Sequence, residues 1–418
     1  MELLRTGDSG IRVPASPPDP TRVALVGALG HGLRHRRAIA SLRERGLARL
    51  VAVANRRPVA PEADAPLDGV AVFDDYRRLL RESDAEIVVV CTPPHTHLPI
   101  ARAVVESGRD LLLEKPPVVS PDEYAVLAAT LARTGVACQV NFQSLASPAL
   151  ARLGAAAARG ALGTPALVSV AGAWWRPDAY YRRSSWAGRR EVDGVATADG
   201  ALGNQFAHAV MQCLAVAERV GGPYRIDLVE LERYRTRDIE VEDTACLRLT
   251  LSTGVRILVA VSVCAADFVY GDLAVHGDRG TARLEFPTDR LKLPGDSEFR
   301  TVTGRVTMLE NLVAHRRDRT VPLLAPLPVT APVVDLLGVL HAAPEPVLVP
   351  RRHLSPHPDG DGQVLTGVVD AIRAAVAAGA LFSELGVAWA RPAYRVTPGP
   401  AAGPPAPPAP APAPPAGT

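Results

Sequence analysis

Lysine is nearly missing from this chain of 418 residues. Only Lys115 and Lys292 are lysines among 46 basic residues, and all the others are arginines. Net charge is also small, because 44 acidic residues leave a formal charge of only +2. Such a balance gives no reason to expect a nucleic-acid or acidic-membrane partner, so a small solute is the expected ligand.

Cysteine pairs and long apolar runs are missing as well. The five cysteines are odd in number, lack a C-x-x-C pair and lie within apolar runs, so we expect buried thiols without disulfides or zinc. His95 and His97 have no Cys/His/Asp cluster around them, and no metal site is expected. No apolar run is long enough to cross a bilayer, and the first residues lack the basic and apolar regions of a signal peptide. We therefore expect a cytoplasmic protein.

The two ends of the chain differ from its middle. Residues 1–20 predict a flexible arm, and the Pro/Ala-rich residues 397–418 ("TPGPAAGPPAPPAPAPAPPAGT") predict a disordered tail. The rest is long and apolar enough for two domains, which we place at residues 21–142 and 143–396.

Residues 21–142 alternate apolar runs with amphipathic stretches. Strands are expected at 21–27, 47–55, 86–92, 110–116 and 136–142, and helices at 31–45, 97–108 and 120–134. Ser120, Pro121 and Glu123 form an N-terminal capping signal for the last of these helices. Continuous apolar strands separated by helices predict an α/β domain with a doubly wound parallel sheet, whose ligand lies at the carboxyl ends of the strands.

The first strand-to-helix turn reads "VGALGHGLRH". Gly27 and Gly32 occupy the first and third glycine places of a dinucleotide fingerprint, Leu29 stands at the second, and Gly30 is additional. Because a strand precedes the turn and a helix follows it, we interpret it as a cofactor-binding turn. A glycine-rich turn without a ligand is the alternative.

The second strand ends in "ANRRP". Asn55 stands where an NAD enzyme usually carries an acid, and Arg56 or Arg57 could pair with a 2′-phosphate. NADP is therefore favoured over NAD, although exposed arginines are also common in turns of so arginine-rich a chain.

The segment "VVVCTPPHTHLPIARAVVESGRDLLLEKPPVVSPDE" at residues 88–123 resembles the marker segment of the Gfo/Idh/MocA oxidoreductases. It has the Pro pair after a strand, the His before a helix, and Glu-Lys-Pro at the end of the next strand. The resemblance, which extends from residue 21 to 395, implies a Rossmann domain followed by an α+β domain with a large open, mostly antiparallel sheet. It also implies that the cofactor-side residues include Thr92, Pro93, His97, Glu114 and Lys115.

The same resemblance implies the catalytic residues. Lys115 would reach the substrate oxygen, and a histidine at the end of an Asp-x-x-x-His pattern would exchange the proton. In "DGALGNQFAHAVMQCL" that histidine is His208, and Asn204 stands in the place of the aspartate. The spacing of four residues puts Asn204 and His208 on one face of a helix.

The segment "AWWRPDAYYRRSSWAGRR" at residues 173–190 concentrates aromatic residues in a chain that has few. Aromatic rings pack on sugar rings and arginines bind hydroxyls or acids, so we expect Trp174, Arg176, Tyr181 and Trp186 to bind the substrate. Alternatively, the segment pins a long loop or fills a subunit contact. A homo-oligomer is expected.

The resemblance thus implies an NAD(P)-dependent oxidoreductase that transfers a hydride between the cofactor and a sugar, cyclitol or related polyol. Two alternatives stay open. One is a cofactor-binding sensor or scaffold without catalysis, to which Leu29 and Asn204 point. The other is a cofactor-assisted lyase or glycosidase, in which the hydride leaves and returns within one turnover.

Overall fold

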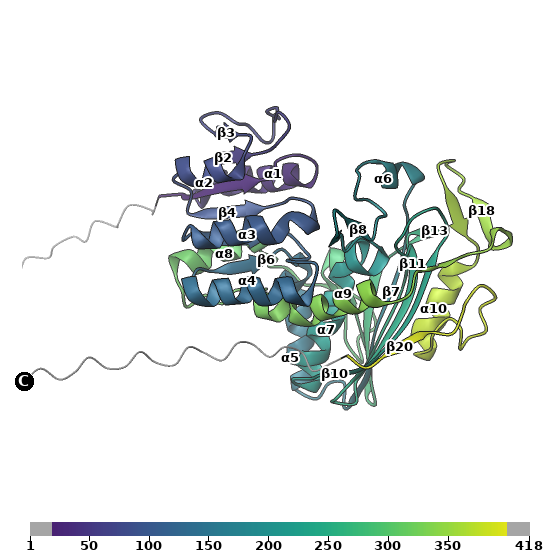
Figure 1. The fold of residues 1–418 in the computed structure, drawn as a ribbon. Helices are drawn as coiled ribbons and strands as arrows, with labels where there is room; N and C mark the ends of the chain where they lie inside the picture. The colour runs from purple at the N-terminus through teal and green to yellow at the C-terminus, as the bar shows by residue number, and fades with distance from the viewer. Residues whose placement is uncertain (1–18, 399–418) are drawn as a thin grey trace, which may run out of the picture.

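The computed structural model describes residues 19–398, and the predicted arm and tail fall largely outside this range. Two sheets with their covering helices make up the described chain (Figure 1). In this part of the chain no helix is long and apolar enough to cross a membrane. All five cysteines are free, four are buried, and Cys91 is half-buried.

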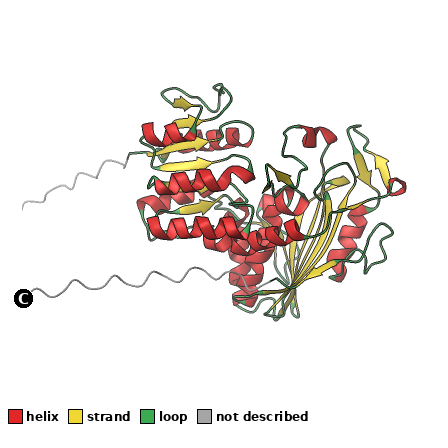
Figure 2. Cartoon of the chain, viewed as in Figure 1, coloured by secondary structure: helices red, strands yellow, loops and turns green. Residues whose placement is uncertain are grey.

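The first sheet has six parallel strands in the order β3-β2-β1-β4-β5-β6, with helices on both faces (Figure 2). Its strands are β1 (Thr21–Val26), β2 (Ala48–Ala54), β3 (Ala71–Phe73), β4 (Ile87–Val90), β5 (Asp110–Leu113) and β6 (Cys138–Val140). Its helices are α1 (His31–Glu44), α2 (Tyr76–Glu82), α3 (His97–Glu106) and α4 (Pro121–Thr134), with short 3-10 turns η1 (Pro94–Thr96) and η2 (Gln143–Ala146). The doubly wound sheet is confirmed.

Local signals explain where these elements begin and end. The Ser120 side chain accepts a hydrogen bond from the Glu123 amide, so the predicted cap of α4 is confirmed. Strand β3 and helix α2 were not predicted from the sequence. Strand β3 has only three residues, of which two are exposed, so it carries almost no apolar pattern.

The second sheet has ten strands, with the order β16-β15-β14-β13-β7-β12-β11-β10-β17 and β20 paired to β10. It is mostly antiparallel, as predicted; β7 with β12 and β10 with β17 are its parallel pairs. The strands are β7 (Pro165–Trp175), β10 (Ile226–Arg235), β11 (Thr244–Leu251), β12 (Arg256–Ser262), β13 (Cys264–Gly277), β14 (Gly280–Glu285), β15 (Arg290–Lys292), β16 (Arg300–Thr301), β17 (Val347–Leu348) and β20 (Tyr394–Val396).

Helices cover both faces of this sheet. One face packs on α5 (Pro148–Ala158) and α7 (Ala207–Gly221) and shares a continuous apolar core with the first sheet. The opposite face packs on α10 (Val368–Ala378) and forms a separate core. Smaller elements are α6 (Asp178–Arg182), the β8 (Glu191–Val192) and β9 (Val195–Ala196) hairpin, the β18 (Leu354–Pro356) and β19 (Gln363–Leu365) hairpin, η4 (Phe286–Thr288) and η6 (Arg351–His353).

One segment departs from the domain limits expected from the sequence. Residues 308–330, assigned to the second domain, return to the first sheet and include α8 (Met308–Arg317) and η5 (Leu327–Thr330) (Figure 1). The Val140 amide donates to the Ala325 carbonyl, and Gln139 bonds Asn311. Helix α9 (Ala331–Ala342) then packs on α4. Residue 143 is therefore not a simple boundary between two units, because the chain crosses back.

The turn between β1 and α1 is very tight. Gly27 has φ of 86°, and a Cβ at Gly27 would lie 2.1 Å from the Cys91 carbonyl oxygen. A Cβ at Gly32 would lie 1.9 Å from the Gly27 carbonyl oxygen. Only glycines let α1 approach the strand this closely, which is the packing role that a dinucleotide turn requires.

Gly32→Ala should therefore destabilise the protein by about 3 kcal/mol, because the clashing group is backbone and cannot rotate away. Gly46→Ala, just past the other end of α1, is the control: its φ is 66° and its Cβ would meet nothing, so about 1 kcal/mol is expected from backbone strain alone. Urea unfolding of both variants measures the difference. Equal losses would show that α1 can shift outward.

Candidate functional site

A cavity of about 890 Å³ lies at the carboxyl ends of β1, β2 and β4, where a doubly wound sheet binds its ligand. Six of the predicted cofactor residues line it: Gly27, Asn55, Arg56, Arg57, Thr92 and Pro93. Gly30 and Gly32 shape the turn beside it. Cavity size, tight glycine turn and helix N-terminus together fit a dinucleotide.

Asn55 holds the loop that carries the two arginines. Its side-chain oxygen accepts a hydrogen bond from the Ala28 amide at 3.2 Å, and its nitrogen donates to the Arg57 carbonyl at 2.7 Å. Asp74 and Asp75 line the same cavity, which the sequence analysis did not anticipate. The exposed Arg56 and Arg57 thus share this rim with two carboxylates.

His97 does not line the cavity, contrary to the role we expected for it. The imidazole is fully buried, with Nδ1 2.8 Å from the Pro116 carbonyl oxygen and Nε2 2.9 Å from the Thr92 carbonyl oxygen. Burial lowers its pKa, although the two carbonyl contacts oppose this. His97 therefore ties the Thr92 loop to the Pro116 loop and acts on a ligand only through them.

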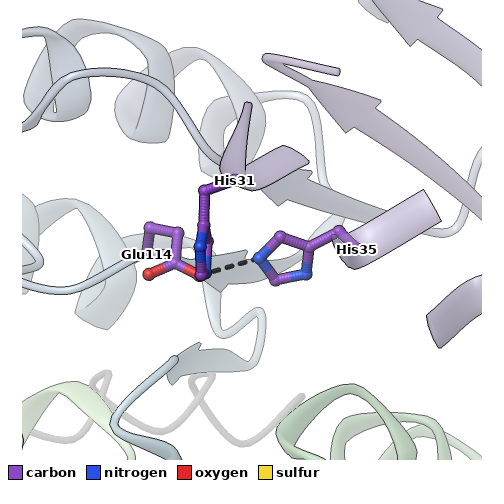
Figure 3. Close-up of side chains that lie close together, drawn as sticks. All are labelled: His31, His35 and Glu114. Carbon is purple, nitrogen blue, oxygen red and sulfur yellow. Dashed lines mark hydrogen bonds and ion pairs between the residues drawn. The ribbon is translucent and has the colours of Figure 1, made fainter. Parts of the chain in front are cut away.

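Glu114 is a buried carboxylate at the centre of a hydrogen-bond network (Figure 3). Its Oε1 accepts from His35 Nε2 at 2.7 Å and from Asn141 Nδ2 at 2.5 Å, and its Oε2 accepts from the Lys115 amide. His31 Nε2 lies 3.4 Å from the same Oε1. Burial would raise the pKa of Glu114, but the two histidines more than offset this and hold the pKa well below its usual range. The ligand atoms of His31, His35 and Glu114 are close enough to share a metal ion, yet these hydrogen bonds account for the arrangement without one.

Lys115 connects the two sheets. From the end of β5, its ammonium donates to both the main-chain and the side-chain oxygen of Asn204, each at 2.8 Å. Burial lowers the pKa of Lys115, while the negative charges of Glu114 and Asp199 partly offset the effect. The ammonium is thus held in a fixed direction, with a proton that is easier to lose than that of an exposed lysine.

Asp199 is a site residue that the sequence analysis missed. It is buried, its Oδ1 accepts from Asn204 Nδ2 at 2.8 Å, and its Oδ2 accepts from the Gly188 amide at 2.7 Å. This fixes the orientation of the Asn204 amide, whose oxygen must then face Lys115. The negative charge that Asn204 lacks is thus supplied one hydrogen bond away. An aspartate five positions before Asn204 was the available signal.

The helix that we expected to carry both Asn204 and His208 is interrupted. Residues Ala201–Gln205 form a π-helical turn, η3, and α7 begins only at Ala207. A buried carboxylate, Glu242, holds this turn by accepting from the Leu202 amide. Such turns are frequent at functional sites, and here the turn directs both oxygens of Asn204 toward Lys115.

His208 lies half-buried at the start of α7, with its ring near those of Phe142 and Phe286. Burial, and next the positive charge of Lys115, lower its pKa to about 3. Its Nδ1 is buried and has no hydrogen-bond partner among residues 19–398. The imidazole is therefore neutral near pH 7.

The four predicted substrate residues are joined through Tyr180: the Arg176 and Arg183 guanidinium groups both lie over its ring, and the Tyr181 ring meets it edge-on at 5.1 Å. Trp174 packs on Phe206, just before α7, with ring centroids 4.3 Å apart, and the Arg176 guanidinium lies 5.3 Å from the Trp174 ring. Tyr181 also contacts Arg237 and lines a separate cavity of about 360 Å³. Burial raises the pKa of Tyr181.

Trp186, the fourth, lies under the Arg183 guanidinium. Trp174 and Arg176 lie beside Phe206, which is two residues from both Asn204 and His208, whereas Tyr181 lines the separate cavity.

Known families match most of this architecture. The sequence model described as "Oxidoreductase family, NAD-binding Rossmann fold" matches residues 21–142, and the "GFO/IDH/MocA C-terminal domain" matches residues 150–283. The chain belongs to the Gfo/Idh/MocA oxidoreductase family. The resemblance noted in the sequence is thereby confirmed.

Individual relatives are more distant. Inositol 2-dehydrogenase 4 of Saccharopolyspora erythraea is 36% identical over 158 residues, which cover 36% of this chain and 44% of that enzyme. The chain matches only 29% to 59% of the length of this enzyme and of two other curated oxidoreductases to which it is similar.

Solved structures share the fold. The WlbA dehydrogenase of Bordetella pertussis, in complex with NADH and UDP-GlcNAcA, has a TM-score of 0.64 at 22% identity, covering 77% of this chain and 96% of that one. An inositol dehydrogenase homolog of Azotobacter vinelandii, in complex with NADH and myo-inositol, has a TM-score of 0.58 at 18% identity, covering 76% and 94%.

Asp199→Asn should lower the pKa of Lys115 further, because it removes a negative charge that stabilises the ammonium. Selective ¹³C labelling of lysine gives only two side-chain signals in this chain, so NMR titration can follow Lys115 directly. Asp238→Asn, at a fully exposed position, is the control. An unchanged Lys115 titration in Asp199→Asn would remove Asp199 from the site.

Proposed function

We propose that this protein is an NAD(P)-dependent oxidoreductase that transfers a hydride between its cofactor and a sugar, cyclitol or related polyol. The observation that carries the proposal is a lysine ammonium that Asn204 fixes and whose charge acts on the neutral His208. Neither residue lines the dinucleotide-sized cavity, but Lys115 follows β5, the neighbour of β4, and the cavity lies at the carboxyl end of β4. A bound nicotinamide supplies the hydride acceptor or donor. The groups of the chain then have to hold the reacting oxygen and move its proton.

Lys115 is suited to hold the oxygen. An ammonium is a compact donor that can stabilise negative charge developing on an alkoxide-like oxygen, and Asn204 keeps it in place before the substrate arrives. Glu114 supports the same loop through the Lys115 amide. The substrate oxygen would accept a hydrogen bond from one N–H group of the Lys115 ammonium. The hydrogen bonds to Asn204 would keep the ammonium in its orientation.

His208 is suited to exchange the proton. During oxidation its neutral imidazole would accept the hydroxyl proton, and during reduction it would return a proton to the carbonyl oxygen. Because the neighbouring Lys115 charge disfavours the imidazolium, the proton taken up is readily released again.

The alternatives of a sensor or a self-recycling enzyme remain testable. Asn204 was one reason to consider lost catalysis, and the buried Asp199 beside it weakens that reason. A dehydrogenase changes the amount of reduced cofactor stoichiometrically with substrate, which neither alternative does. A homo-oligomer remains our expectation for its assembly, to be measured by light scattering.

Lys115→Arg should lower kcat by about a hundredfold or more, because a broad guanidinium fork cannot take the place of the ammonium between Asn204 and the substrate. Folding and cofactor affinity should be retained. The assay is turnover with the best polyol from a screen, with a parallel cofactor titration. Lys292→Arg changes the other lysine, whose Nζ donates to the nearby Ser297 carbonyl at an exposed position, and should leave turnover unchanged. Near-wild-type turnover in Lys115→Arg would exclude Lys115 from the mechanism.

For the cofactor, we propose a preference for NADP(H), based on Arg56 and Arg57 at the cavity rim. NADP(H) should bind more tightly than NAD(H) by about 1–3 kcal/mol at low salt, and the gap should shrink as salt is added. Arg56→Ala or Arg57→Ala should remove it, whereas Arg81→Ala, on the exposed side of α2, should not. If Asp74 and Asp75 dominate the rim instead, NAD(H) will bind as tightly or more tightly.

A further inference from the structure

Four aromatic side chains form a continuous strip that begins at Phe206, midway along the chain between Asn204 and His208, and ends in solvent. In order they are Phe206, Trp174, Phe268 and Tyr270, which we call the aromatic strip. Trp174 is 4.3 Å from Phe206 and lies parallel to Phe268 at 6.2 Å, and Phe268 meets Tyr270 edge-on at 4.7 Å (centroid distances). Phe206 directly precedes the helix of His208.

The register of the second sheet puts the strip on the face toward the first domain. Tyr270 in β13 pairs with Gly172 in β7. The Phe206 ring packs directly on Gly172, because a Cβ at that position would be 2.2 Å from the ring. Val269, between the two outer aromatics, belongs instead to the core on the opposite face. Phe268 and Tyr270 therefore lie on the same face as α7, and they remain 59% and 50% exposed.

Unpartnered polar atoms accompany the strip. Trp174 Nε1, Arg176 Nε and Gln205 Oε1 are buried without a hydrogen-bond partner in the described part of the chain. Gln205 itself is 8% exposed, and its nitrogen donates to the Tyr180 hydroxyl. Buried polar groups are nearly always satisfied in a finished core, so unsatisfied donors and an acceptor beside exposed rings indicate a ligand site.

We propose that the substrate carries a second ring beyond the one that reacts, and that the outer half of the aromatic strip, Phe268 with Tyr270, binds it. This inference rests on the proposed function, because the reacting ring is taken to lie against Lys115 and His208. Phe206 is 1% exposed and only supports the strip from behind, so one cyclitol or sugar ring can lie only against the half-buried Trp174 at its inner end. The occupant of the outer half is the aglycone ring of a glycoside, stacked through its flat apolar face.

The test uses phenyl and methyl glycosides of the same sugars as probes, for example glucosides, galactosides, mannosides and glucuronides. Each pair is titrated calorimetrically into cofactor-loaded full-length protein. In at least one pair the phenyl glycoside should bind about five- to tenfold more tightly, which is the effect expected of one or two aromatic stacking contacts. Disaccharides of the preferred sugar then show whether a second sugar ring stacks as well as an aryl ring.

Phe268→Ala and Tyr270→Ala should each reduce the phenyl preference by at least half while leaving methyl glycoside binding unchanged. Leu348→Ala is the matched control, since it removes an exposed apolar side chain from a distant strand of the same sheet. Absence of a phenyl preference in every pair, or a preference that survives both substitutions, would overturn the proposal. So would conversion of an oligomer to monomers by Phe268→Ala without loss of the preference, which would identify the strip as a subunit contact.

This result is separable from the proposed function. The phenyl preference is a binding difference and should persist in Lys115→Arg, where turnover is expected to fall. Turnover without a phenyl preference would retain the oxidoreductase and reject the second-ring site. A phenyl preference with no turnover on any probe would retain the second-ring site and reject the oxidoreductase.

Discussion

The contact between the Lys115 ammonium and Asn204 is the interaction on which the site depends. It connects the end of a strand in the first sheet to the turn that precedes the main helix of the second domain. Lys115 is directed by Glu114 on one side, and Asn204 is directed by Asp199 on the other. A displacement of either domain would leave a buried ammonium without its acceptors, which is costly.

The charges around this contact explain why the neighbouring histidine is neutral. One cation, Lys115, lies between two buried carboxylates, Glu114 and Asp199, both of which favour its charged form. Burial already lowers the pKa of His208, and the positive charge of Lys115 lowers it further because a second cation would face the first. The two groups thus have separate roles. Lys115 carries the positive charge, and His208 is neutral and can hold a proton only briefly.

Residue pattern alone predicted the parts of the fold that depend on local sequence. The alternation of apolar strands and amphipathic helices, the Ser120 cap and the glycine turn each act within a few residues, and the structure shows them where expected. Asp199 and the π-helical turn were missed because their roles arise from contacts with Gly188 and Glu242, which periodicity does not reveal. The return of residues 308–330 to the first sheet was missed for the same reason, since it depends on pairing between distant segments such as Gln139 and Asn311.

For the aromatic segment at residues 173–190, the sequence showed that aromatic side chains are concentrated there but not which way each one points. Trp174 and Tyr181 are seven residues apart and equally aromatic, yet one packs beside α7 and the other against Arg237. Their separation follows from the end of β7 at Trp175, after which the chain leaves the sheet and alternation no longer assigns faces. Within β7, successive side chains alternate between the two faces of the sheet. Trp174 and Gly172 are two residues apart, so both lie on the face where Phe206 packs. The absence of a side chain at Gly172 is therefore what lets the ring of Phe206 reach the sheet and bring the aromatic strip up to the start of the His208 helix.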